Sequence, residues 1–236
     1  MKLSAPIYHL KRQAKTLSRN EKIPLHEALD RIAEQEGSRG WSYLAAKFAT
    51  AAPAEKLFSR LAPGDMVLVG ARPGQGKTLM SLEIATQAMK AGNRAVLFTL
   101  EYTVKDVLDR FRAIDAEPAN FKNLFGFESS DSISADYIVR KLAAAPSGTL
   151  VIVDYLQLLD QKRENPELMV QVRTLNSFAK ERGLIFVFIS QIDRSYDPST
   201  KPCPGLEDVR LPNPLDLSLF SKTCFLNNGE VRMQWS

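Results

Sequence analysis

The sequence has little cysteine and no long apolar run. Cys203 and Cys224 are its only cysteines among 236 residues, and neither belongs to a CxxC pair. A disulfide scaffold and a zinc site of the usual spacing are therefore not indicated, and we expect both thiols to be reduced. No apolar run approaches 18 residues, and the start, MKLSAPIYHLKRQAK, lacks the apolar stretch of a secretory signal. We expect a cytoplasmic protein that does not contact a membrane.

Histidine is equally scarce, which leaves charge as the more informative property. His9 and His26 are the only histidines, and both lie in the amino-terminal segment, away from any cluster of acids and cysteines. Residues 1–50 hold nine lysines and arginines against five acids, an excess equal to the net charge of +4 of the whole chain. A basic segment beside a neutral domain could bind nucleic acid, although a solvated helical face has the same composition.

The apolar spacing in residues 1–50 predicts two short helices, with Pro24 near the start of the second and Gly37 just past its end. Trp41, Leu44 and Phe48 continue an apolar stripe that we expect to pack the two helices together or onto the main domain. A small basic helical unit is therefore expected over 1–50, followed by a connector over 51–64 and a larger main domain over 65–236.

From residue 65 onward, four apolar runs alternate with helical patterns. The runs cover 66–71, 94–100, 149–159 and 183–191, and the helical patterns cover 78–92, 103–114, 134–145 and 165–183. Runs rich in Val, Ile and Phe are typical of strands buried on both faces of a parallel sheet. The alternation predicts a doubly wound, mostly parallel α/β domain. Near the end, Asn228-Gly229 between two short runs predicts a β-hairpin.

The stretch VLVGARPGQGKT, residues 67–78, resembles a phosphate-binding loop but departs from its usual form. The GxxxxGK template has glycine six positions before the lysine, where this sequence has Ala71. Gly74 and Gly76 occupy the tight part of the loop, and Ala71 falls at the strand exit, where we expect a methyl group to fit. A strand, this loop and a helix in succession favour phosphate binding, with Lys77 on the outer phosphates and Thr78 on Mg²⁺.

Polar side chains at the ends of three other predicted strands complete a candidate site. Asp154 follows four apolar residues, Glu101 follows another strand, and Gln191 ends a third. Ligands of doubly wound sheets bind at the carboxyl ends of the strands, so we expect these groups to gather there. A buried strand rarely ends in an unpaired acid, which favours a functional Asp154. Glu101 taken alone could equally cap the next helix.

These motifs together resemble the RecA-like ATPases, and specifically the motor domain of the bacterial replicative helicase (DnaB) family. The resemblance spans roughly residues 57–236 and is carried by ARPGQGKT, TLEY, VIVDYLQLL, FISQIDRS and EDVR. The phosphate loop of that family typically reads ARPxxGKT, so Ala71 is similar to a family variant. The resemblance implies a loop that binds ATP through eight residues, namely Ala71, Arg72, Pro73, Gly74, Gln75, Gly76, Lys77 and Thr78.

The same resemblance implies roles at the strand ends. Asp154 would support the Mg²⁺ held by Thr78, commonly through water, and Glu101 would orient and activate the attacking water. Gln191 would sense the γ-phosphate and, with Lys77 and Glu101, complete the catalytic set. Single-stranded DNA and a hexameric ring of identical subunits are the partners that the family implies.

Two loops are candidates for DNA contact. The loop after Asp154 offers Lys162 and Arg163, and the loop DRSYDPSTKPCPG offers Arg194 and Lys201 as phosphate contacts and Tyr196 as a stacking platform. Three prolines in the second loop equally suit an ordinary surface loop.

The sequence departs from the family in two places. The short basic segment stands where the family has its primase-interacting domain, so we expect loading through the usual contacts not to occur. The family's Lys-x-Arg finger, which acts on the neighbouring subunit's ATP, is not matched, because Cys224 follows Lys222 at the arginine position. Arg210 and Arg232 are possible substitutes. A nucleotide-dependent switch with slow turnover, and a DNA-binding module that uses the basic segment, are therefore alternatives to a motor.

Overall fold

The computed structural model describes residues 4–5, 7–47, 53–114, 116–121, 123–160, 164–211, 213–228 and 230–235. The chain divides into two compact units, whose main parts are residues up to 53 and residues 54–227. Each unit has a core of its own, described below. Among the described residues, none of the helices combines the length and the apolarity that a membrane crossing requires.

The amino-terminal unit consists of three helices around a small core. They are α1 (Ile7–Glu21), α2 (Leu25–Gln35) and α3 (Trp41–Lys47). Pro24 is the N-cap of α2, and Gly37 follows the helix with a φ of 75°, as expected for these residues. Leu44 of α3 is fully buried among apolar residues of α1 and α2, so the stripe that begins at Trp41 packs the helices together. Phe48 lies outside the described residues.

The second unit is built on one sheet. Its seven described strands follow the order β3-β2-β4-β5-β1-β6-β7, and the pairs among β1 to β6 are parallel. Their bounds are β1 Met66–Ala71, β2 Ala95–Thr99, β3 Phe125–Glu128, β4 Leu150–Asp154, β5 Ile185–Gln191, β6 Lys222–Asn227 and β7 Glu230–Trp235. β6 and β7 form the predicted antiparallel pair, and Asn228 between them has a positive φ of 46°.

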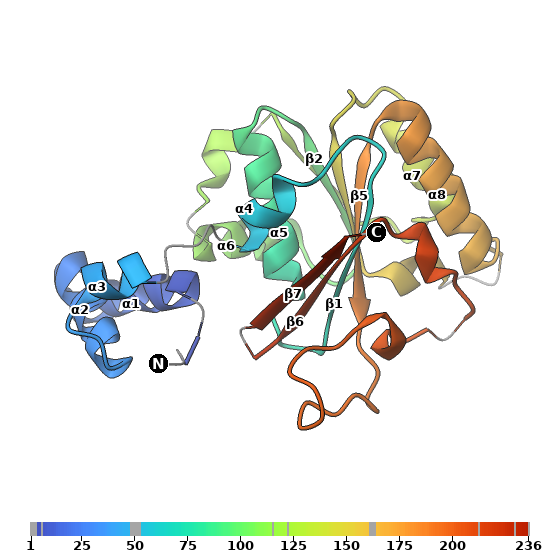
Figure 1. The fold of residues 1–236 in the computed structure, drawn as a ribbon. Helices are drawn as coiled ribbons and strands as arrows, with labels where there is room; N and C mark the ends of the chain where they lie inside the picture. The colour runs from blue at the N-terminus through green and yellow to red at the C-terminus, as the bar shows by residue number, and fades with distance from the viewer. Residues whose placement is uncertain are drawn as a thin grey trace. The chain divides into compact units, whose positions relative to one another are not determined.

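Helices cover both faces of this sheet, as a doubly wound fold requires (Figure 1). One face carries α4 (Pro53–Phe58), α5 (Lys77–Lys90) and α6 (Val104–Ala113), and the other carries α7 (Ala135–Leu142) and α8 (Leu168–Arg182). Short 3₁₀ helices η1 (Pro118–Phe121), η2 (Leu156–Asp160), η3 (Leu206–Asp208) and η4 (Leu217–Leu219) lie in the connections. This confirms the predicted fold class.

The apolar runs of the sequence contribute side chains to two cores, because neighbouring residues of a strand point to opposite faces of the sheet. Along β1, Met66 and Leu68 belong to the core under α7 and α8, whereas Val67 and Val69 belong to the core under α4, α5 and α6. The central strands β4 and β5 alternate in the same way and are buried almost throughout. Strands buried on both faces are therefore apolar at nearly every position, and the polar exceptions, such as Asp154 and Ser190, lie at their carboxyl ends.

Several local expectations were wrong. The run 149–159 is strand only to Asp154 and then forms η2. The helical pattern expected from residue 165 begins only at Leu168 as α8, after Glu167, and the Asn165 amide donates to the Leu159 carbonyl at 3.2 Å. The short, half-buried β3 was not expected at all. Within the expected connector, residues 53–58 form α4, whose Ala54 and Leu57 are buried in the core of the second unit.

Candidate functional site

The phosphate loop between β1 and α5 forms a tight turn for which its residues are suited. The Gln75 amide donates to the Arg72 carbonyl at 3.3 Å, so residues 72–75 close a β-turn with Pro73 and Gly74 at its centre. Gly74 has a φ of 79°, the value that a type II turn requires at its third position. A methyl group at Gly74 or Gly76 would meet no atom within 4 Å, so backbone approach to this loop is open.

The loop leads directly into the amino end of α5. Gly76 is the N-cap, in the left-handed conformation with φ 85°, and no side chain caps the first amides of the helix. The first turn contains no acidic residue. Uncapped amides and the positive end of the helix dipole favour an anion at this place.

The irregular position in the loop motif has a packing explanation. Ala71 is the last residue of β1 and is fully buried, so it belongs to the sheet and its methyl group fills the core. Gly70, one residue earlier, faces the ring of Phe225, and an added Cβ would come within 2.7 Å of that ring. The glycine is needed at 70 for packing, and the turn glycines are those at 74 and 76.

Thr78 and Asp154 join the loop to the end of β4. The Thr78 hydroxyl donates to Asp154 Oδ2 at 3.1 Å, and the Asp154 side chain is fully buried. Burial, helped by the negative charge of Glu101, raises the pKa of Asp154 to about 6. Its other oxygen, Oδ1, has no hydrogen-bond partner among the described residues. A buried carboxylate oxygen without a donor is a site where a cation would be stabilised.

Tyr102 and Arg110 border this pair, and sequence reasoning gave them no role. The Tyr102 hydroxyl lies 3.5 Å from Thr78 Oγ1, and the Arg110 guanidinium lies 3.9 Å from the centre of the Tyr102 ring. The charge of Arg110 also acts to lower the pKa of Asp154, against the larger effect of burial. Tyr102 directly follows Glu101 in the sequence, and this position could have indicated that Tyr102 lies near the site. The sequence around Arg110 does not distinguish it from an ordinary exposed residue of a helix.

The structure brings Glu101 toward Asp154 and places Gln191 beside the loop. Glu101 is exposed and lies two residues past Thr99, the last residue of β2, which is in register with Asp154 of β4. Gln191 ends β5 in register with Ala71 of β1. The Gln191 carbonyl accepts from the Arg210 amide at 2.8 Å, so the main chain at Gln191 is bonded to the segment that returns after the next loop.

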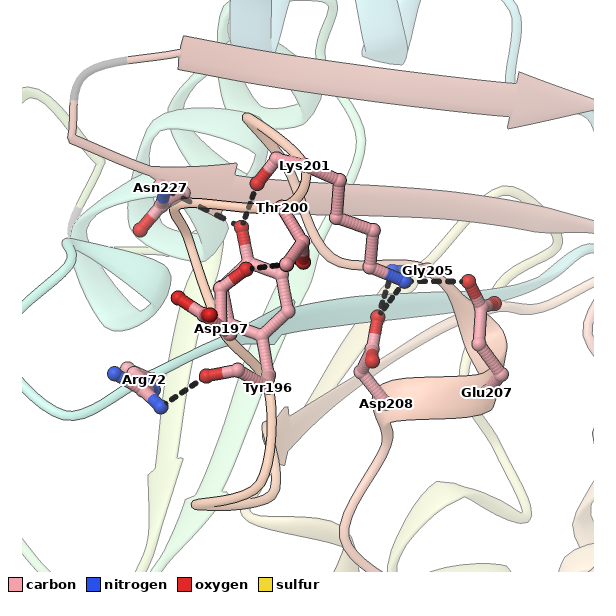
Figure 2. A network of polar contacts seen from close by, with 9 residues as sticks. All are labelled: Arg72, Tyr196, Asp197, Thr200, Lys201, Gly205, Glu207, Asp208 and Asn227. Carbon is pink, nitrogen blue, oxygen red and sulfur yellow. Dashed lines mark hydrogen bonds and ion pairs between the residues drawn. The ribbon is translucent and has the colours of Figure 1, made fainter.

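That loop, residues 193–208, is closed at its base and tied to the phosphate loop. Ile192 and Val209 form an antiparallel bridge, and the Asp193 amide donates to the Asp208 carbonyl at 2.7 Å. Figure 2 shows Arg72 reaching from the phosphate loop to the main chain at Tyr196. The Arg72 guanidinium donates to the carbonyls of Arg194, at 3.0 Å, and of Tyr196, and lies 5.5 Å from the centre of the Tyr196 ring.

In the same network Tyr196 is buried and the Lys201 ammonium pairs with two carboxylates (Figure 2). Tyr196 is only 3% exposed, so the expectation that it could stack on a base is wrong in this structure. Its hydroxyl donates to the Lys201 carbonyl at 2.9 Å and lies 3.4 Å from the Asn227 amide. The Lys201 ammonium pairs with Glu207 at 2.6 Å and with Asp208 at 2.5 Å. A DNA phosphate at Lys201 would have to compete with these two carboxylates.

Comparison with known proteins agrees with this arrangement. A family model described as the DnaB-like helicase C-terminal domain matches residues 52–124 and 127–213. The chain belongs to this family. The replicative DNA helicase DnaB of Synechocystis sp. is 27% identical over 177 residues, which cover 62% of this chain and 20% of that protein. A probable plasmid replicative DNA helicase of Chlamydia trachomatis is 25% identical over 181 residues, which cover 64% of this chain and 40% of that protein.

Solved structures show the same fold. The ATPase domain of G40P is similar with a TM-score of 0.58 at 19% identity, covering 78% of this chain and 79% of that one. A DnaB-like replicative helicase, studied for its interactions with primase, gives a TM-score of 0.59 at 19% identity and covers 92% of this chain and 65% of that one. The chain spans well under half the length of the curated relatives named above.

The remaining candidates of this DnaB-like domain lie at different places. Lys162 and Arg163 are outside the described residues. Arg194, Arg210 and Arg232 have exposed side chains, the last on β7. Lys222 begins β6 and pairs with Asp65 at 2.5 Å, with 16% and 12% of the two side chains exposed. Because β6 runs parallel to β1, this ion pair lies at the amino edge of the sheet, opposite the phosphate loop.

The residues present fit a Mg²⁺ ion only together with a phosphate ligand. Among the described residues no three carboxylate, histidine or cysteine side chains cluster as a metal site. Thr78 Oγ1 and Asp154 Oδ1 are hard oxygen donors beside the open loop, and magnesium in proteins commonly takes one or two such ligands with substrate phosphates and waters.

Proposed function

We propose that the chain binds ATP with Mg²⁺ and hydrolyses it, as a RecA-like ATPase of the replicative-helicase type that acts on or alongside DNA. The observation that carries the proposal is the Thr78–Asp154 contact. It joins a phosphate loop and a helix end with Gly76 as its N-cap to a buried carboxylate whose second oxygen has no donor among the described residues. Family membership supports the nucleotide and the reaction class.

In this proposal the backbone amides of Gly74, Gly76, Lys77 and Thr78 hold the phosphates, and the Lys77 side chain reaches the outer ones. Pro73 has no amide hydrogen, and the Gln75 amide donates to the Arg72 carbonyl. Bound Mg²⁺, held by Thr78 and Asp154, would neutralise charge on the phosphate oxygens. The exposed Glu101 carboxylate orients water and accepts its proton as the new bond to phosphorus forms and the bond to the ADP oxygen breaks. Gln191 would relay the state of the γ-phosphate, and the hydrogen bond from the Arg210 amide, at the far end of the 193–208 loop, to the Gln191 carbonyl supports this role.

A nucleotide-dependent switch with slow turnover is the second candidate. Two observations favour it: Lys201 is held by two carboxylates, and Tyr196 is buried. As placed here, the 193–208 loop therefore offers DNA neither the base-stacking ring nor the uncompensated lysine that a motor loop would use. The same ATP site serves both candidates, and they differ in turnover and in the response to DNA.

Steady-state ATP hydrolysis over a range of protein concentrations, with and without single-stranded DNA, tests the proposal. We expect Lys77→Ala to lose ATP binding, and Glu101→Gln to keep binding while kcat falls about 10²–10⁴-fold. Glu117→Gln, a change at an exposed carboxylate outside the site, is the matched control. Stimulation by DNA that rises with protein concentration supports a motor, whereas slow turnover indifferent to DNA supports the switch. ATP binding that survives Lys77→Ala would contradict both.

A further inference from the structure

Tyr102 lies in the connection between β2 and α6, and local hydrogen bonds fix its main chain there. It precedes Thr103, the N-cap of α6, whose hydroxyl accepts the Asp106 amide at 3.3 Å. The Thr103 amide in turn donates to Asp106 Oδ2 at 2.9 Å, which completes a capping box. The partly buried Tyr102 ring packs against the core under α4, α5 and α6. Both the main chain and the ring of Tyr102 are therefore held in place.

Arg110 adds a second constraint on the same ring. Its guanidinium donates to the Asp106 carbonyl at 3.1 Å and lies 3.9 Å from the centre of the Tyr102 ring. Side chains of a helix lean toward its amino end, which brings Arg110 back over a residue that precedes α6. A cation over an aromatic ring contributes about 0.5–2 kcal/mol. The Tyr102 hydroxyl is thus presented to the phosphate loop by a ring with little freedom to turn away.

The hydroxyls of Tyr102 and Thr78 and the carboxylate of Asp154 form a chain with a defined direction. The Tyr102 hydroxyl lies 3.5 Å from Thr78 Oγ1, which lies 3.1 Å from Asp154 Oδ2. At pH 7, above the pKa of about 6 of Asp154, the carboxylate is ionised and can only accept. Thr78 has a single hydroxyl hydrogen and gives it to Asp154, so Tyr102 is the donor to Thr78. This order leaves one lone pair of Thr78 Oγ1 unused within the chain of hydroxyls.

We propose that Tyr102 is a positioning residue for the magnesium ligand Thr78, whose hydroxyl it orients so that the remaining lone pair is available to the Mg²⁺ bound with ATP. Hydrogen bonds from an outer group orient the groups that hold a metal, and their loss lowers metal affinity. Tyr102 is assigned no contact of its own with the metal and acts through Thr78. The inference rests on the proposed function, because that proposal assigns Thr78 to Mg²⁺.

The test removes one hydroxyl and measures the contribution of Mg²⁺ directly. Tyr102→Phe keeps the ring beneath Arg110 and deletes the donor to Thr78. The matched control is Tyr137→Phe on α7, which deletes a hydroxyl that donates to Glu128 Oε2 at 2.8 Å on the opposite face of the sheet. A fluorescent, hydrolysis-resistant ATP analogue is titrated in excess Mg²⁺ and in EDTA, and the ratio of the two Kd values is the gain in affinity from Mg²⁺. Steady-state hydrolysis at saturating ATP is then measured against free Mg²⁺.

We expect Tyr102→Phe to reduce the gain from Mg²⁺ about tenfold and to raise the free Mg²⁺ at half-maximal hydrolysis by a similar factor. Its affinity in EDTA and its kcat at saturating Mg²⁺ should stay within about twofold of the wild type, as should every value for Tyr137→Phe. An unchanged gain from Mg²⁺ in Tyr102→Phe, even with a lower Tm, would show a merely structural hydroxyl and overturn the inference. Equal losses of affinity in Mg²⁺ and in EDTA would also overturn it, and would make Tyr102 a nucleotide contact. If wild-type binding of the analogue were indifferent to Mg²⁺, the metal role of Thr78 in the proposed function would fail first, and this inference with it.

Discussion

At the scale of single residues, Asp154 links stability to function. Its pKa rises from 3.8 to about 6 on folding, mainly because the carboxyl is buried. Between these pH values the folded state binds more protons than the unfolded state, so stability of the ligand-free protein falls as the pH rises through that window. At pH 7 the ionised, buried carboxylate costs about 3 kcal/mol on this basis.

We therefore expect Asp154→Asn to stabilise the ligand-free protein at pH 7 by about 1–3 kcal/mol, because it removes a buried charge, and to lose most Mg²⁺-dependent ATP hydrolysis. Urea titrations at pH 7 and pH 4.5 measure the first effect, and the gain should shrink at the lower pH, where the wild-type carboxyl is already protonated. Thr78→Val, which removes the donor to Asp154, should instead lower stability. A gain from Asp154→Asn that is equal at both pH values would contradict this account.

Some site residues could be predicted from sequence and others could not. The glycine turn of the phosphate loop is an unusual local sequence and identifies Lys77 and Thr78. An acid at the end of a buried strand is also unusual and identifies Asp154. The structure brings Thr78 and Asp154 together, although their catalytic roles remain predictions. Tyr102 and Arg110 are ordinary residues until the fold places β2, α5 and α6 side by side. Their proximity to the site is a tertiary property, which no local pattern contains.

At the scale of elements, apolar runs and helix stop signals located most strands and helices. The run of β5 and the end of the helical pattern at residue 183 were predicted. Burial on two faces constrains residue type strongly, and so does a left-handed C-cap, which Gly183 forms with a φ of 66°. β3 was missed because it has four residues, includes Gly126 and is only half-buried at the sheet edge. The start of α8 was missed because its N-cap, Glu167, makes no side-chain cap bond and so leaves little local signal.

The bond between two loops through Arg72 gives a prediction at this scale. Arg72→Ala removes the donors to the carbonyls of Arg194 and Tyr196, so the 193–208 loop should open more often. One or two such bonds are worth about 1–2 kcal/mol, which corresponds to roughly tenfold faster trypsin cleavage after Arg194. The cleavage rate of Arg72→Lys should lie between those of the wild type and Arg72→Ala, because an ammonium lacks the planar fork of a guanidinium.

The control for this experiment is Arg60→Ala, which removes a guanidinium that lies 5.5 Å from the centre of the Trp235 ring on β7. Its cleavage rate after Arg194 should match that of the wild type. Hydrogen exchange over residues 193–208 gives a second reading that does not depend on the protease. If Arg72→Ala left both the cleavage and the exchange unchanged, the loop would be held by the Tyr196 and Lys201 contacts alone.

At the scale of the whole molecule, the two units have separate cores of very different size. The amino-terminal core contains six fully or nearly fully buried apolar residues, whereas the sheet of the second unit separates two much larger clusters. Small cores bury too little apolar surface to be strongly stable. We therefore expect local unfolding of α1 to α3 at a lower free energy than unfolding of the central strands.

Ligand binding should then distinguish the local stabilities of the two units in one experiment. A ligand that binds only the folded state stabilises it by about 2.7 kcal/mol at a hundred times its Kd. With Glu101→Gln to preserve ATP, Mg²⁺ and ATP should slow hydrogen exchange in β1, β4 and β5, which end at the proposed site, and leave α1 to α3 unchanged. Equal slowing of hydrogen exchange in both units by ATP would mean that the two units unfold together as one cooperative body. The free energy of local unfolding would then be the same for the two cores.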